Sequence, residues 1–329
     1  MIELDGLTWW AIDPHEHCRD EEQKRKATIA EVLCLALSQG VGIVYDMPNT
    51  ERPVIDRYRV WERLALVPKG QENRYRLYVG LTDEVEQILE ALWCYDNIPE
   101  VIGLKMFCGR SVGNLTVIEP DAQRMVYRIL AEQGYTGPLA LHCEDEQMMN
   151  AEIFKWDNPI THGWARPIEA EESSVYNQIM FALAERFKGK IHICHVSSPL
   201  SVILIQWAKG LSLRISCGVT PHHIMWDEGK MSGPDGLDYK MNPPLRPLEV
   251  VVMLRQMLCR GMIDVIETDQ AAHTAEEKRP PQCLSGYPSL TLYRQFVTEF
   301  LPSLGLQAIQ IKALTHDNVI RIFDKGGRQ

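Results

Sequence analysis

The sequence has no uninterrupted apolar run of about 18 residues, which is the length that a membrane-spanning helix needs. It also has no basic excess, because 34 lysines and arginines stand against 44 aspartates and glutamates and give a formal net charge of −10. Binding to nucleic acid needs a basic surface, so this charge argues against nucleic acid as the main partner. With 45% hydrophobic and 24% charged residues, the composition is that of a globular protein with a large core.

The nine cysteines contain no CxxC pair, and their odd number does not fit a framework of disulfides. We therefore expect reduced thiols and a cytoplasmic location. The first ten residues carry early acids and no basic segment, so we expect no secretory signal there.

Short β-rich runs alternate with amphipathic stretches along the chain. We expect eight strands, over residues 7–13, 41–46, 76–81, 101–106, 139–142, 190–195, 213–217 and 263–268. Helical spacing of apolar residues predicts helices that include 21–39, 85–95, 121–133, 173–187 and 248–260. This rhythm fits a (β/α)8 barrel and also a doubly wound sheet. No linker-like stretch divides the chain, so we expect a single domain over residues 1–329.

The polar residues favour the barrel. They fall at or just after the carboxyl ends of different expected strands, where barrel enzymes build their sites. These residues are His15, His17, Asn49, Lys105, His142, His195, His222 and Asp269.

Several of these side chains suit metal binding. His15 and His17 are two residues apart on one strand, so both imidazoles share a face and could hold one ion, although a chance HxH pair is common. Lys105 is the only charge in an apolar strand. It either pairs with a carboxylate or carries carbon dioxide as a carbamate, whose oxygens can bridge two metals.

Seven ordered motifs together resemble those of dihydroorotases, which are metal-dependent (β/α)8 barrels of the amidohydrolase superfamily. They lie at residues 13–20 (DPHEHCRD), 47–50 (MPNT), 103–105 (GLK), 195–198 (HVSS), 219–223 (VTPHH), 241–246 (MNPPLR) and 268–274 (TDQAAHT). The lysine of the GLK motif resembles the lysine of the dihydroorotases that carry a carboxylated lysine and two zinc ions.

The resemblance implies a role for each matching residue. His15 and His17 would hold the first zinc, and His142 and His195 the second. Carboxylated Lys105 and a hydroxide would bridge the two Zn²⁺ ions of the chain. Asp269 would bind the first metal and carry the catalytic proton. The substrate would be bound by Arg19, Asn49 and His273 at its carboxylate and, at its ring, by Asn242 and the backbone near Gly286 and Tyr287. A mobile loop over residues 108–116 would close on the substrate through Ser111 or Thr116.

Three features depart from the family pattern. Gln270, Ala271 and Ala272 stand where His-Ala-Pro is frequent, which leaves the effect of Gln270 and Ala272 on the rate open. Glu16 replaces an apolar residue between the two histidines and needs a partner away from the metals. The chain is short at both ends, so we expect the β-sandwich that flanks many relatives to be reduced or absent.

The resemblance implies reversible zinc-dependent cyclisation of N-carbamoyl-L-aspartate to L-dihydroorotate in de novo pyrimidine synthesis. The alternatives are a hydantoinase-like or allantoinase-like cyclic amidohydrolase, or a non-catalytic dihydroorotase-like subunit. Arg19 favours the first, because a guanidinium suits a substrate carboxylate that neutral hydantoins lack. We also expect a homo-oligomer, with association with other enzymes of the pathway as a further possibility.

Three other side chains complete the expectations. Cys194 and His223 either bind an additional metal or are buried without function. His162 lies in a less regular stretch, and we expect it at the surface.

Overall fold

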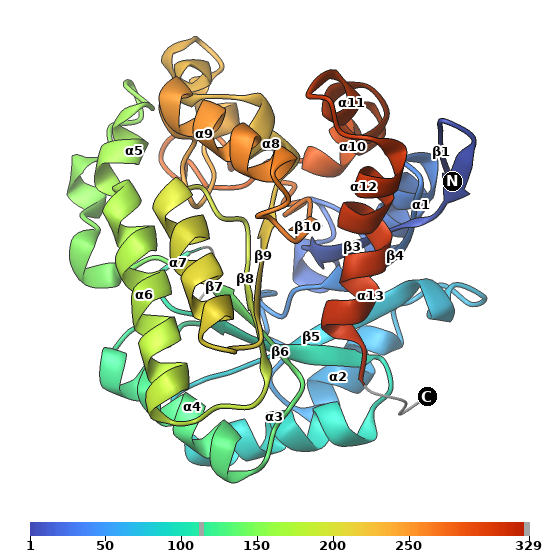
Figure 1. The fold of residues 1–329 in the computed structure, drawn as a ribbon, viewed down its shortest axis with the longest axis vertical. Coiled ribbons are helices and arrows are strands. Elements are labelled where there is room, and N and C mark those ends of the chain that lie inside the picture. Colours follow the sequence, from blue (N-terminus) through green and yellow to red (C-terminus); the bar gives the residue numbers. More distant parts are fainter. Residues whose placement is uncertain (112–114, 326–329) are drawn as a thin grey trace.

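Eight parallel strands form one sheet that curves around a central axis (Figure 1). The computed structural model describes residues 1–111 and 115–325. The sheet runs in chain order, with strands β3 (Ala11–Glu16), β4 (Val41–Asp46), β5 (Tyr75–Gly80), β6 (Val101–Phe107), β7 (Pro138–His142), β8 (Lys190–Ile193), β9 (Ile215–Val219) and β10 (Val265–Ile266). A separate antiparallel hairpin pairs β1 (Ile2–Leu4) with β2 (Leu7–Trp9).

Helices follow the strands and cover the outside of the sheet (Figure 1). They are α1 (Ile29–Ser38), α2 (Arg57–Leu64), α3 (Val85–Asn97), α4 (Pro120–Glu132), α5 (Thr161–Ala165), α6 (Ile168–Ala184), α7 (Pro199–Gly210), α8 (Pro221–Met225), α9 (Leu248–Cys259), α10 (Tyr293–Gln295), α11 (Leu301–Ser303), α12 (Ala308–Lys312) and α13 (Asn318–Phe323). Short π-helical segments at Phe296–Phe300 and Ala313–Asp317 interrupt the last group.

Backbone bonds after β10 bring the last strand back to the first. The Asp269 N–H donates to the carbonyl of His15, and the His17 N–H donates to the carbonyl of Gln270, both at 3.0 Å. Gln270 bridges to Glu16 on one side and to Tyr287 on the other. The expected (β/α)8 barrel is therefore confirmed, with this irregular seam in place of a regular final ladder.

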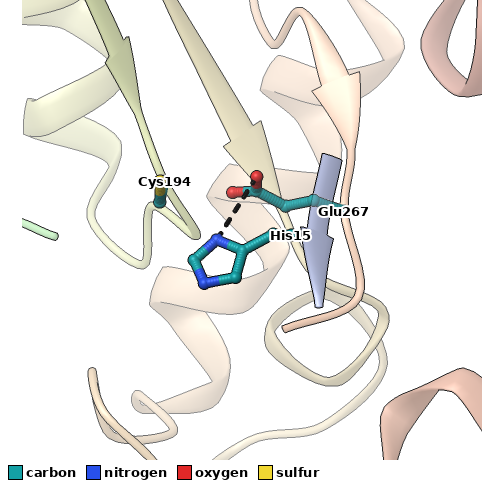
Figure 2. A group of neighbouring side chains, drawn as sticks. All are labelled: His15, Cys194 and Glu267. Carbon is teal, nitrogen blue, oxygen red and sulfur yellow. Dashed lines mark ion pairs between the residues drawn. The ribbon is translucent and has the colours of Figure 1, made fainter. Parts of the chain in front are cut away.

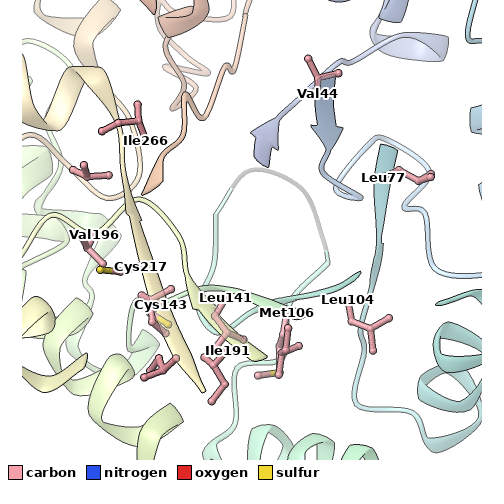
Figure 3. Packing of buried hydrophobic residues seen from close by; sticks show 14 of the residues in the cluster. Val44, Leu77, Leu104, Met106, Leu141, Cys143, Ile191, Val196, Cys217 and Ile266 are labelled. Atoms are coloured by element: carbon pink, nitrogen blue, oxygen red, sulfur yellow. The ribbon is translucent and has the colours of Figure 1, made fainter. Parts of the chain in front are cut away.

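Alternation along the strands separates the packing residues from the polar ones. Figure 3 shows Leu104, Met106, Leu141 and Ile191 in the buried apolar layer between the sheet and its helices. The residues between them in sequence point the other way, into the barrel, because successive side chains of a strand face opposite sides. Lys105 on β6 is one of them, and it is fully buried. At the opposite end of the barrel, Phe323 of α13 packs into a second apolar cluster.

Several expected element boundaries differ from the structure, among them the strand expected over 263–268, which covers only Val265–Ile266, and two others are wrong in an informative way. Residues 7–13 do not form one strand, since Leu7–Trp9 belongs to the hairpin and the barrel strand begins at Ala11. The helix expected over 21–39 begins only at Ile29, because Thr28 and Glu31 form a capping box at its start. A 3-10 turn at Glu21–Gln23 precedes it.

Within the described residues, no helix is both long and apolar enough to cross a membrane. All nine cysteines are free thiols.

Candidate active site

A cavity opens at the carboxyl ends of the barrel strands. It is lined by His15, His17, Arg19, Asn49, Phe107, Ser111, His142, His195, Asn242, Asp269, Ala271, Ser285 and Gly286. The space directly over the imidazoles is about 30 Å³. An adjoining chamber of about 380 Å³ shares Ser111, Asn242 and Ser285 with it. The structure therefore brings together residues from positions 15 to 286 that the sequence predicted as one site.

Asp269 lies between the two histidines of the first strand. Its Oδ1 is 3.4 Å from Nε2 of His15 and 2.9 Å from Nε2 of His17. On the other side of the cavity, Nδ1 of His142 is 3.2 Å from Nε2 of His195. The ring centroids of His15 and His195 are 5.0 Å apart, so the two pairs adjoin.

Lys105 lies beneath these rings with no opposing charge. Its Nζ is 3.2 Å from Sγ of Cys194 and 4.8 Å from the ring centre of Phe107. No carboxylate of the described residues lies within ion-pair distance of this amine. The pairing alternative from the sequence therefore has no partner in the structure, and a fully buried lysine without a counter-charge is costly.

Burial favours the neutral form of each imidazole. It lowers the pKa of His15 to about 4, with nearby Lys105 acting in the same direction. Burial also lowers the pKa of His142, and it lowers that of His17 and His195 well below the usual value. Neutral imidazoles close to a carboxylate are a donor set that Zn²⁺ and similar ions prefer. His15, His17 and Asp269 form one group whose ligand atoms all lie within 4.8 Å of one another, so these residues fit a metal.

Glu267 adjoins the same site, and the sequence analysis did not single it out. Figure 2 shows its carboxylate beside His15, with Cys194 opposite; Oε2 of Glu267 is 3.6 Å from Nδ1 of His15. These three residues form the second group with metal-ligand spacing. Glu267 also accepts bonds from the backbone N–H of His195 and from Nε2 of His192, the latter at 3.2 Å. Burial alone would raise its pKa, but His192 and His15 outweigh burial and hold that pKa far below the usual range.

A second supporting carboxylate stands behind His142. Glu144 accepts from Nε2 of His142 at 2.9 Å and is held by Arg166, which bonds to both of its oxygens. This contact leaves Nδ1 of His142 directed toward His195. Burial would raise the pKa of Glu144, but Arg166 and His142 outweigh it and keep the group ionised.

The end of the cavity near the first loop is cationic. Arg19 is 3% exposed, and its guanidinium reaches the carbonyl of Ala272 at 3.2 Å and Nε2 of His273 at 3.4 Å. Burial lowers the pKa of Arg19 to about 10, so it stays charged at neutral pH. Burial and Arg19 lower the pKa of His273 to about 3. Among the described side chains, no carboxylate forms an ion pair with Arg19, and Asn49 lines the same end.

The remaining expected substrate residues fall into two groups. Asn242, Ser111 and Gly286 line the cavity, and Nδ2 of Asn242 donates to Oγ of Ser111 at 3.3 Å. The side chain of Tyr287 instead stacks on Tyr239, with ring centres 5.8 Å apart. Thr116 is half-buried and does not line the cavity. Residues 112–114 of the expected loop lie outside the described residues.

The expectation for His162 is wrong. It is buried, and its Nε2 lies 2.9 Å from the carbonyl of Met241 and 3.0 Å from Oδ1 of Asn242. His162 therefore supports Asn242 from behind. His223 has both ring nitrogens engaged, with Thr220 at 2.7 Å and the carbonyl of Pro243 at 3.0 Å, and it joins neither group with metal-ligand spacing.

Two departures from the family pattern have structural explanations. Oε1 of Gln270 accepts from the N–H of Leu290 at 2.9 Å, so this side chain secures the seam and does not line the cavity. Glu16 is buried beside Asp13. Burial, reinforced by Asp13, raises the pKa of Glu16 well above its usual value, and burial raises the pKa of Asp13 to about 6. Burial next to a second carboxyl therefore favours the protonated form of Glu16.

Three of the non-glycine cavity residues have positive φ angles, and one of them is Arg19 (φ 59°). The other two, His195 (φ 37°) and Asp269 (φ 49°), lie there too, in a region that few non-glycine residues occupy, although histidine and aspartate do so more often than most. The N–H of His195 bonds to Glu267, and that of Asp269 bonds to the first strand. Such strain is typical of functional sites, where neighbouring bonds hold the residue in place.

Solved structures with the same architecture are named as dihydropyrimidinases and hydantoinases. Dihydropyrimidinase from Brevibacillus agri has a TM-score of 0.80 at 18% identity and covers 95% of this chain and 70% of its own. L-hydantoinase (dihydropyrimidinase) from Arthrobacter aurescens has a TM-score of 0.81 at 18% identity and the same coverage. At this identity the likeness shows a shared barrel fold.

Curated sequences identify the family. Dihydroorotase of Endomicrobium trichonymphae is 30% identical over 332 residues, which span 99% of this chain and 75% of that protein. Dihydroorotase of Methanosarcina mazei is 31% identical over 284 residues, covering 82% of this chain and 59% of its own length. The chain belongs to the dihydroorotase family. It spans about three-fifths of the length of the relatives from M. mazei and Leifsonia xyli. No protein-family model matches it.

Proposed function

We propose that the chain is a dihydroorotase that interconverts N-carbamoyl-L-aspartate and L-dihydroorotate in pyrimidine synthesis. The observation that carries the proposal is a cavity with two chemically different ends. One end has four neutral imidazoles, Asp269 and an unpaired lysine. The other has buried, charged Arg19 with no carboxylate partner. A substrate with a reactive amide and a carboxylate matches both ends.

His15, His17 and Asp269 would hold one Zn²⁺, and His142 and His195 the other, with carboxylated Lys105 bridging them. The buried, unpaired amine of Lys105 supports this assignment, because addition of carbon dioxide converts it into an anionic ligand. When bound, the metal pair would polarise the amide carbonyl and lower the pKa of a water molecule.

The chain's own residues would orient the substrate and move the proton. Arg19, Asn49 and neutral His273 would bind the substrate carboxylate, while Asn242 and the backbone at Gly286 and Tyr287 would face the ring. In the hydrolytic direction a water oxygen bonds to the ring carbonyl carbon and the C–N bond breaks. Asp269 would accept a proton from that water and deliver it to the leaving nitrogen. Synthesis reverses these steps.

The hydantoinase-like alternative has support from the fold neighbours alone. Arg19 argues against it, because a neutral hydantoin would leave this buried charge without a partner. Non-catalytic relatives typically lose metal ligands, whereas all six expected metal residues are retained in this sequence.

The test measures the absorbance change of L-dihydroorotate with zinc-loaded protein. We expect turnover by the wild type, a large rise in KM for Arg19→Met with unchanged metal content, and no effect from Arg25→Met at an exposed position. Lys105→Ala should lose most of the bound metal, while Lys69→Ala should keep it. Better turnover of a neutral hydantoin, or full metal retention in Lys105→Ala, would contradict the proposal.

We further propose that the described chain acts as one catalytic domain on small molecules in the cytoplasm. Nine free thiols support a reducing compartment.

A further inference from the structure

The amine of Lys278 is buried where two loops of the chain meet. Lys278 is 7% exposed, and its Nζ donates to the carbonyl of Lys240 at 3.0 Å. The same Nζ donates to the carbonyls of Leu284 at 3.2 Å and Gly286 at 2.8 Å. An ammonium has three N–H donors, so these three carbonyls use all of them.

Both loops form part of the wall of the candidate active site. The loop over residues 240–247 contains Asn242, and the loop over residues 283–288 contains Ser285 and Gly286. All three of these residues line the cavity. The amine of Lys278 therefore joins two parts of the wall that are distant in sequence.

Lys278 acts on this wall from behind, because its side chain lines neither the cavity nor the adjoining chamber. The carbonyl of Lys240 also accepts from the Gly286 N–H at 2.8 Å, so the amine reinforces a direct bond between the loops. The carbonyl of Ser285 accepts from Nε2 of His273 at 2.9 Å. The same loop therefore also contacts an expected ligand of the substrate carboxylate.

No carboxylate neutralises this amine. Within the described part of the chain Lys278 forms no ion pair, and the acids beside it pair elsewhere, Glu277 with Lys26 at 3.1 Å and Asp238 with Arg279. Burial of an ammonium without an opposing charge is costly unless its hydrogen bonds are satisfied. The three carbonyls supply those bonds, so the position of the amine and the positions of the two loops depend on one another.

We propose that Lys278 is a positioning residue, which holds the two loops so that Asn242 and the backbone at Gly286 face the substrate ring. This inference rests on the proposed function, because it concerns binding of the same substrate. Loops that are already held in their bound shape lose less conformational entropy when the substrate binds. Without the amine, three carbonyls lose a donor and the loops keep fewer bonds, so the substrate binds more weakly.

The test compares Lys278→Met with the wild type in turnover of L-dihydroorotate by zinc-loaded protein at pH 6.5. Burial lowers the pKa of Lys278 to about 7, so the ammonium form predominates at this pH. Methionine has a side chain of similar length without a donor. KM should rise at least about 10-fold and kcat should change less than about 3-fold, because the loops contribute to binding and not to the chemical step. Metal content should stay unchanged.

Hydrogen exchange of a peptide that spans residues 284–287 measures the loop itself. It should be at least about 10-fold faster in Lys278→Met than in the wild type. The matched control is Lys190→Met, because Nζ of Lys190 also donates to backbone carbonyls, those of Arg321 at 3.3 Å and Asp324 at 2.8 Å. Lys190 begins β8 and so lies at the end of the barrel opposite the cavity. Its substitution should change neither KM nor this exchange.

Thermal unfolding shows whether each variant folds. If Lys278→Met does not, Lys278→Gln replaces it, since a side-chain amide keeps two N–H donors; a raised KM in that variant supports the proposal, and a wild-type KM overturns it. In folded Lys278→Met, an unchanged KM, unchanged exchange or loss of metal would overturn the proposal, as would an equal rise in KM for Lys190→Met. A wild type without turnover would contradict the proposed function and, with it, the role in substrate binding, while the exchange would still decide whether Lys278 holds the two loops.

Discussion

At the scale of single residues, one carboxylate supports both sides of the candidate metal site. Glu267 approaches Nδ1 of His15 and accepts from the backbone of His195, so it contacts a residue from each expected metal position. Gly218 makes room for it, because a Cβ at that position would overlap with the Glu267 carboxylate. Fixing one ring nitrogen of a histidine directs the other toward a metal.

Glu267→Ala should therefore lower metal affinity by about 10- to 100-fold. Gly218→Ala should also lower metal affinity although it leaves Glu267 in the sequence, because the added methyl group displaces the Glu267 carboxylate. Gly210→Ala is the matched control, since a Cβ there meets nothing within 4 Å. Competition with a chelator measures all three. If Gly218→Ala bound metal as tightly as the wild type, the position of the Glu267 carboxylate would not affect metal affinity.

The buried Glu16–Asp13 pair leads to a second prediction. A carboxyl whose pKa is raised in the folded state stabilises the protein at low pH, and this stability is lost as pH rises from its unfolded pKa toward its folded pKa. Glu16→Gln cannot ionise and keeps a donor for Asp13. It should match the wild type near pH 4.5 and exceed its unfolding free energy by at least about 1 kcal/mol at pH 7. Denaturant unfolding at both pH values measures this. A variant less stable than the wild type at pH 7 would contradict a raised pKa for Glu16 in the folded protein.

Much of the candidate site follows from residue spacing in the sequence. The sequence analysis put His142 and Asp269 at the ends of two different strands, and in the structure both line one cavity, with Lys105 buried on the strand beside them. Alternation within strands points to residues that the sequence analysis passed over, because Glu267 lies two before Asp269 and Glu144 lies two after His142. Arg166 carries no such signal, since it reaches Glu144 from a distant loop through tertiary packing.

At the scale of elements, strand order was predictable and boundaries were less so. Hydrophobic runs mark strands because their burial dominates local preference, whereas a helix start depends on a few capping bonds. The expected helix reached back to residue 21, although its apolar stripe begins at Ile29, and Thr28 and Glu31 set the true start. The T-I-A-E pattern at 28–31 contains the signal for it.

That capping box has a measurable contribution. Oγ1 of Thr28 accepts from the Glu31 N–H at 3.2 Å, and the Thr28 N–H donates to the Glu31 carboxylate at 2.8 Å. Thr28→Ala should lower the unfolding free energy by about 1 kcal/mol. Exposed Thr136 provides the control, where the same substitution should change stability by less than about 0.5 kcal/mol. Equal effects of the two substitutions in urea unfolding would mean that the box does not stabilise α1.

At the scale of the whole molecule, closure of the barrel buries most of the histidines, and this burial lowers their pKa values. The parallel order of the strands follows from the alternation in the sequence, but the seam does not, because Gln270 joins Glu16 and Tyr287 through isolated bridges with no strand pattern. Around that closed end, burial lowers the pKa of eight of the ten histidines. The folded chain thus keeps most of its imidazoles neutral.

This arrangement predicts a steep loss of stability in mild acid for the metal-free protein. A histidine with a lowered folded pKa stabilises the fold above its unfolded pKa of about 6.5, and this stability is lost as pH falls toward the folded value, about 4 for His15 and His223. Each such histidine adds up to about 1.4 kcal/mol per pH unit to the slope, so eight acting together should unfold the chain cooperatively between pH 6.5 and 4. Bound metal should move the transition to lower pH, because metal and protons compete for the same nitrogens.

His162 isolates one contribution to that slope, since it is buried outside the proposed ligand set and burial lowers its pKa well below the usual value. His162→Gln keeps a donor for the carbonyl of Met241 and removes one titrating group. The variant should lose less stability than the wild type between pH 6.5 and 5, by up to about 1.4 kcal/mol per pH unit. The matched control is His316→Gln, at a residue whose side chain is 28% exposed, which should follow the wild-type curve more closely. Unfolding free energies across this pH range measure the difference. If the unfolding free energies of His162→Gln and the wild type fell equally between pH 6.5 and 5, burial of neutral His162 would not contribute to the loss of stability in acid.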